Sequence, residues 1–66
     1  MPDPADREVY FEFTVIGASV KVAAIDSLTA IEVSITGPAN APRAELQRVA
    51  LQKLKARLSR EQGAKP

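Results

Sequence analysis

The residues that could do chemistry in this chain are its charged side chains, because the usual catalytic and metal-binding types are missing. The 66 residues contain no histidine and no cysteine, which removes Ser–His, Cys–His and zinc–water mechanisms. The acid–base pair that remains is Glu12 and Glu32, expected to flank Ala23 on the outer face of a sheet. Such a face offers no burial to tune a pKa and no cage for Mg²⁺ or Ca²⁺. We therefore predict a protein that is not an enzyme and that binds no cofactor and no metal.

Basic side chains concentrate in the second part of the chain. Residues 1–42 carry two basic and six acidic side chains, a net charge of −4, whereas residues 43–66 carry seven and two, a net charge of +5. Five of the basic residues are expected on one helix: Arg48, Lys53, Lys55, Arg57 and Arg60. Such a face could contact phosphates, so nucleic acid is a candidate partner. The interpretation that we favour is a solvated helix face whose side-chain stems cover apolar surface.

Apolar side chains on the outer face of the expected sheet are the second candidate for function. Tyr10, Ile16 and Ile25 belong to this face, and Tyr10 is expected opposite Ile25. A modest apolar patch on an uncovered sheet can bind a protein partner. Self-association is a related candidate, because a chain this short without a disulfide or a metal often depends on a second copy. The alternative, apolar residues scattered over an ordinary exposed face, stays open.

Residues 8–36 of the folded part are expected to form strands. In residues 9–16, the apolar side chains at the odd-numbered positions alternate with those of Tyr10, Glu12, Thr14 and Ile16. This period of two is typical of a strand with one buried face. Gly17 begins a two-residue connection that suits a type II′ turn. This hairpin places Phe13 opposite Val22 and makes the buried faces of both strands coincide.

A second connection is predicted at residues 26–29, which contain polar turn residues but no glycine. If Ile25 and Ala30 close this loop, Val22 lies opposite Val33. The apolar sets coincide again, which predicts a meander with the second strand in the middle.

The rest of the chain is expected to form one helix. Gly37 and Pro38 end the third strand. Asn40 is the expected N-cap, and Pro42 falls in the first turn, where its missing N–H is not needed. Nothing interrupts the helix before about Arg60. The apolar stripe expected on it comprises Leu46, Val49, Ala50 and Leu54, widened by Leu51 and Leu58.

The predicted fold class is therefore α+β, a three-stranded antiparallel β-meander packed on one C-terminal α-helix. The helix is expected to cover the whole inner face of the sheet, because nothing else can cover it. That face comprises Phe11, Phe13, Val15, Val20, Val22, Val33 and Ile35. We expect one domain at residues 8–60, a disordered tail at residues 1–7 and a frayed tail at residues 61–66.

The expected compartment is the cytoplasm. The first six residues are acidic and contain two prolines, unlike the positive and then apolar start of a signal peptide. No apolar run approaches the ~20 residues that span a bilayer. The sequence thus predicts a soluble protein with no membrane partner.

Several segments resemble a family of short uncharacterised alphaproteobacterial proteins, classed as a domain of unknown function. They are residues 8–13, 24–26, 32–33 and 37–43. The resemblance covers about residues 8–60 and implies no activity and no functional residues. The preferred hypothesis is a small non-enzymatic protein-interaction domain, whose partner is another protein or a second copy of the chain. The alternative is a nucleic-acid-binding module that uses the basic helix.

Overall fold

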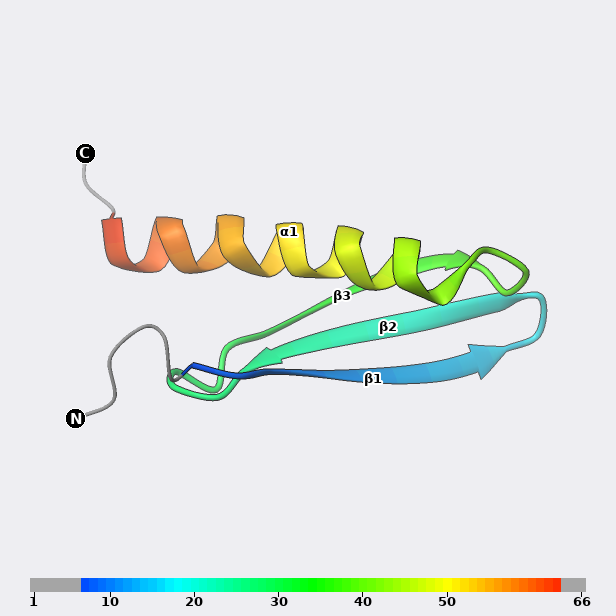
Figure 1. Ribbon diagram of the computed structural model, residues 1–66, viewed down its shortest axis with the longest axis horizontal. Coiled ribbons are helices and arrows are strands. Elements are labelled where there is room, and N and C mark those ends of the chain that lie inside the picture. Colours follow the sequence, from blue (N-terminus) through cyan, green and yellow to red (C-terminus); the bar gives the residue numbers. More distant parts are fainter. Residues whose placement is uncertain (1–6, 64–66) are drawn as a thin grey trace.

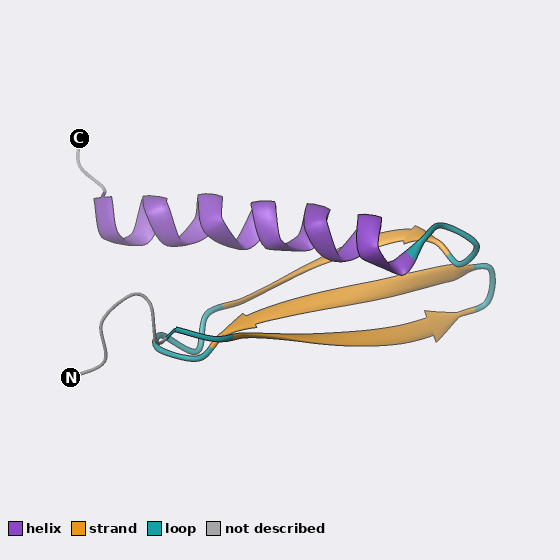
Figure 2. Cartoon of the chain, viewed as in Figure 1, coloured by secondary structure: helices purple, strands orange, loops and turns teal. Residues whose placement is uncertain are grey.

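The computed structural model describes residues 7–63, with side chains through residue 61, and contains one sheet and one helix in two layers (Figure 1, Figure 2). The elements are β1 (Val9–Ile16), β2 (Ser19–Asp26), β3 (Glu32–Pro38) and α1 (Arg43–Gly63). The strands are antiparallel in the order β1-β2-β3. The α+β fold class is therefore confirmed. The helix continues three residues past its predicted end, and the other parts of the two predicted tails, residues 1–6 and 64–66, lie outside the described residues.

The first hairpin has the predicted turn and register. Gly17 has a φ of 61°, and Ala18 is not among the residues with positive φ, as a type II′ turn requires. Val15 lies opposite Val20, and Phe13 lies opposite Val22. The hairpin thus follows from a period-two pattern and one glycine, both of which are local in sequence.

The predicted register of the second hairpin is wrong by two residues. Val22 lies opposite Ile35 rather than Val33, because the loop is closed by Asp26 and Ile31. Both loop ends therefore move one residue along the chain, and every partner moves by two. A shift of two keeps each side chain on its predicted face, since the period of a strand is two. The inner faces of β2 and β3 still meet.

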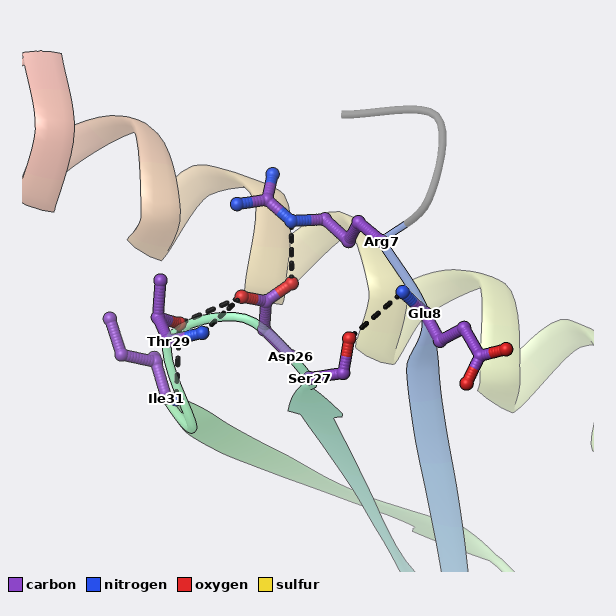
Figure 3. A network of polar contacts seen from close by, with 6 residues as sticks. All are labelled: Arg7, Glu8, Asp26, Ser27, Thr29 and Ile31. Atoms are coloured by element: carbon purple, nitrogen blue, oxygen red, sulfur yellow. Dashed lines mark hydrogen bonds and ion pairs between the residues drawn. The ribbon is translucent and has the colours of Figure 1, made fainter. Parts of the chain in front are cut away.

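A buried carboxylate sets the position of this loop (Figure 3). The Asp26 side chain is fully inaccessible to water. Its Oδ2 accepts hydrogen bonds from the Thr29 N–H at 2.9 Å and from the Thr29 hydroxyl at 2.8 Å. Its Oδ1 lies 2.8 Å from Nε of Arg7, a residue that the sequence analysis assigned to the tail. Ala30 completes the loop with a φ of 63°, an uncommon conformation for a residue other than glycine.

The helix begins one residue after Pro42, and Asn40 is not its cap. The Pro42 carbonyl accepts the N–H groups of Glu45 and Leu46 at 3.1 and 3.2 Å, so Pro42 occupies the position before the first turn. Asn40 lies further back, in the turn that the Ala41 N–H closes onto the carbonyl of residue 38. Asn40 therefore belongs to the turn that connects β3 to α1, and not to the end of the helix.

Gly37 lets the first turn of α1 approach the end of β3. A Cβ added at this position would lie 2.6 Å from Cδ2 of Leu46, closer than two carbon atoms can pack. Leu46 is itself buried. Gly37 is thus required by close approach, and its φ is not in the left-handed region.

The buried stripe of α1 has a spacing of four residues: Leu46, Ala50, Leu54 and Leu58. Val49, which was expected in this stripe, is 38% exposed. The stripe packs on β2 and β3 and makes at most slight contact with β1. In Figure 1, β1 is the strand farthest from α1. The helix therefore covers two strands, and the prediction that it covers the whole inner face is wrong.

Candidate interaction surface

β1, which α1 covers only in part, exposes apolar side chains on both faces of the sheet. On the inner face, Phe11 and Phe13 are only half-buried and Val15 is 60% exposed. On the outer face, Tyr10 is 54% and Ile16 is 60% exposed. We call these five residues the β1 surface. Within the described residues, three of the five exposed large hydrophobic side chains belong to it: Tyr10, Val15 and Ile16.

The structure brings together two of the three residues predicted for a partner surface. Tyr10 and Ile25 lie opposite each other on the outer face, as predicted. Ile16 lies six residues along β1 from Tyr10, which is about 20 Å in an extended strand. Ile16 is instead adjacent to Val15, at the hairpin end of the strand. The predicted residues thus lie at the two ends of the β1–β2 hairpin rather than in one compact patch.

Val15 is the residue that sequence reasoning missed, although a signal for it exists. An α-helix is about 10 Å wide, and strands lie about 4.8 Å apart, so one helix covers two strands and not three. One strand of a three-stranded sheet must then lose its cover. The short loop between β3 and α1 places the helix near β3, and β1 at the opposite edge is left open.

Polar contacts on the outer face are few and exposed. The Tyr10 hydroxyl donates a hydrogen bond to Oε1 of Glu8 at 2.8 Å. This bond and the negative charge of Glu8 raise the pKa of Tyr10 above its usual value.

Glu12 lies opposite Ala23, whereas Glu32 lies opposite Ile25. The two carboxylates therefore do not flank the same residue, and the expectation that both lie beside Ala23 is wrong.

Arg43 partly shields the middle of the β1 surface. Its guanidinium carbon lies 4.8 Å from the centre of the Phe13 ring. A cation over a ring at this distance contributes about 0.5–1 kcal/mol at an exposed site. The side chain of the first residue of α1 thus packs over an aromatic ring of β1.

Within residues 7–61, the outer edge of β1 presents free backbone hydrogen-bonding groups. In an antiparallel pair, residues alternate between bonding the neighbour and facing away from it. The Glu8 carbonyl accepts the Ser27 N–H at 2.9 Å, so the even-numbered residues of this segment bond to β2. The odd-numbered residues therefore turn their N–H and C=O groups to the open side: Val9, Phe11, Phe13 and Val15.

The outer edge of β3 is, in contrast, partly blocked. The Asp26 N–H donates to the Ile31 carbonyl, so the even-numbered residues of β3 face the open side. Among them, Ser34 accepts a hydrogen bond on its carbonyl from Nζ of Lys53 at 2.8 Å. Pro38 has no N–H to offer. A lysine and a proline are two of the devices by which natural sheets discourage pairing at an edge.

The five basic residues considered as possible nucleic-acid contacts are not equally available. Lys53 bonds the sheet edge, Arg48 pairs with Glu45, and Nε of Arg57 lies 3.0 Å from Oε2 of Glu61. Both ion pairs are exposed and contribute little to stability. Arg48 lowers the pKa of its carboxyl partner through their hydrogen bond and its charge. Within residues 7–61, Lys55 and Arg60 make no hydrogen bond and no ion pair.

Within the described residues, no pocket is present and no three acidic side chains gather as metal ligands. The same part of the chain contains no helix that is long and apolar enough to cross a membrane.

Comparison with protein-family models matches residues 6–61 to a family described as "Domain of unknown function (DUF6898)". Searches of the curated proteins and of the solved structures found no match. The expected resemblance to an uncharacterised domain family is confirmed.

Proposed function

Because the chain belongs to the family of domain of unknown function DUF6898, whose description states no activity, we propose a function from its surface. We propose that it is a small non-enzymatic protein-interaction domain and that the β1 surface is its binding site. The observation that carries this proposal is the exposure of Val15 and Ile16, each 60%, on opposite faces of one edge strand. A partner that covers this strand would bury apolar side chains on both sides of the sheet.

The backbone of β1 supports the same conclusion. A segment that pairs with an exposed sheet edge gains affinity from main-chain hydrogen bonds and specificity from side chains on alternate faces. Within the described part of the chain, the β1 edge offers four residues with free N–H and C=O groups, and exposed apolar side chains lie on both faces beside them. Both requirements of strand addition are therefore present on one strand.

Site-specific photo-crosslinking in living cells tests this proposal. A benzophenone amino acid at position 10 or 15 is expected to give discrete adducts heavier than the 7.1 kDa chain. The matched control is position 59 on the exposed side of α1, which lies outside the β1 surface. Adducts of equal yield at all three positions, or none at positions 10 and 15, would contradict the proposal.

Nucleic-acid binding by the basic helix is the alternative, and Lys55 and Arg60 are the observation in its favour. Two phosphate contacts would give a slope of about −1.8 in a plot of log affinity against log salt. The protein-interaction proposal instead predicts no binding of fluorescent duplex DNA or RNA at low salt. Salt-sensitive binding that is lost in the double variant Lys55→Gln, Arg60→Gln would favour the alternative.

Two further expectations belong to this proposal. A cytoplasmic location agrees with the absence of a spanning helix from the described residues. An origin among alphaproteobacteria rests on the resemblance of residues 8–13 and 37–43. Both stay predictions.

A further inference from the structure

We propose that the partner of the β1 surface is a second copy of the same chain. In this dimer, β1 pairs antiparallel with β1 of the partner subunit, and a two-fold axis passes between the two Phe13 residues. The result is a continuous six-stranded sheet that carries both helices on one face. The inference rests on the proposed function, because it names the occupant of the same surface.

The free edges of the described sheet determine which strand can be extended. On β3, Lys53 occupies the Ser34 carbonyl and Pro38 lacks an N–H, so a continuous ladder cannot form there without displacing the lysine. No side chain of the described residues makes a hydrogen bond to the outward carbonyls of β1. The sheet can therefore grow through β1 (Val9–Ile16).

Charge and polarity then select the register. Free groups belong to the odd-numbered residues, so an odd residue must lie opposite an odd residue of the other copy. With Phe13 on the axis, Phe11 lies opposite Val15 of the partner subunit, and apolar side chains meet on the inner face. Glu12 then lies opposite Thr14 of the partner subunit.

The two neighbouring registers are less favourable. An axis at Glu12 places this carboxylate directly opposite Glu12 of the partner subunit, and like charges in that position are destabilising. An axis at Thr14 places Glu12 opposite Ile16 of the partner subunit and leaves Tyr10 beyond the paired segment. The register centred on Phe13 pairs residues 10–16, keeps both Tyr10 and Ile16 within the paired segment, and opposes no like charges.

The off-centre position of α1 leaves room for this assembly. Each helix lies over β2 and β3, so the two axes would be about 20 Å apart at a strand spacing of about 4.8 Å. Each helix is about 10 Å wide, so the two helices do not collide. Phe11, Phe13 and Val15 of both copies form one apolar strip between them. If each helix were centred over its own three-stranded sheet, the two helices of the dimer would lie closer together.

The mass of the unmodified chain in solution is the first test. Sedimentation equilibrium from about 5 µM to about 500 µM is expected to show a concentration-dependent shift from 7.1 kDa toward twice this mass. Val15→Lys is expected to keep the domain folded and to leave it monomeric, because it places a charge beside the pairing edge. Thr36→Lys is the matched control on the exposed side of β3 and is expected to leave the dimer intact.

Single cysteines test the register, because the natural chain contains none. Two Phe13→Cys chains would place their Cα atoms about 5.5 Å apart, within the range of a disulfide. Two Val15→Cys chains would hold theirs about 13 Å apart, which is too far. A mixture of Phe11→Cys and Val15→Cys chains is expected to form a mixed disulfide. This mixed disulfide is a second test of the register, because both of its chains retain the Phe13 side chain.

The possible outcomes separate this inference from the proposed function. A chain that stays at 7.1 kDa at every concentration overturns the dimer, as does a dimer that survives Val15→Lys but not Thr36→Lys. Adducts at positions 10 and 15 that contain a different protein would then still support the interaction domain. Adducts of twice the chain mass support both.

Discussion

Leu54→Ala is expected to lower the free energy of unfolding by about 3 kcal/mol, which is most of what a domain of this size has. Leu54 is the largest fully buried side chain, with no exposed surface, at the centre of the helix stripe. Its removal leaves a cavity between α1 and the sheet, and a two-layer fold has few other contacts that could close it. Urea denaturation followed by far-UV circular dichroism measures the effect.

Val49→Ala is the matched control for this prediction. Both residues are branched aliphatic side chains on α1, but Val49 is 38% exposed and lies outside the buried stripe. We expect it to cost less than about 1 kcal/mol. The protein concentration must be equal for all variants, since dimer formation would add to the apparent stability. Equal losses in the two variants would contradict the packing of α1 through residues 46, 50, 54 and 58.

Asp26→Ala is expected to destabilise the domain by about 2–3 kcal/mol. This loss is smaller than that expected on breaking a fully buried ion pair, because Arg7 is partly exposed. The Arg7 side chain is 27% exposed, whereas that of Asp26 is fully buried. The substitution removes the acceptor of both Thr29 hydrogen bonds and the partner of the guanidinium. The loop between β2 and β3 then loses the group that holds it in place.

Two further variants separate the parts of this effect. Arg7→Gln removes the charge partner and keeps the bonds to Thr29, so we expect it to cost less than Asp26→Ala. Thr29→Val removes the hydroxyl and keeps the backbone N–H, which still donates to Asp26 at 2.9 Å. In a double-mutant cycle, Arg7→Gln and Asp26→Ala are expected to be non-additive, because each removes the same contact. Strict additivity would show that the ion pair contributes nothing.

The same residue predicts a pH dependence of stability. Burial raises the pKa of Asp26, but the hydrogen bonds from Thr29 and the charge of Arg7 lower it by more in sum, so the net pKa lies below its ordinary value of 3.8. A pKa lower in the folded than in the unfolded chain adds stability above the unfolded value. This stability is lost as the pH falls through the folded pKa. Denaturation midpoints between pH 6 and 2 should therefore fall more steeply for the natural chain than for Asp26→Ala. Parallel curves would contradict the assignment.

The two hairpins show where sequence reasoning succeeds and where it fails. The first register was predictable because a period-two pattern and Gly17 at the turn both act locally. The second was missed because its loop depends on a contact between distant parts of the chain. Asp26 is stabilised there by Arg7, 19 residues earlier. Ala30 adopts a left-handed conformation that its residue type does not signal.

The meander, the helix and the face on which each strand residue lies could all be predicted from the sequence, because they follow from local periodicity and turn chemistry. Tertiary structure alone decided where the helix lies across the sheet. One helix is too narrow for three strands, and its buried stripe and Lys53 hold it over β2 and β3. The same placement covers one edge of the sheet and exposes the other. The candidate site on β1 therefore results from packing between layers, which no pattern along the strand records.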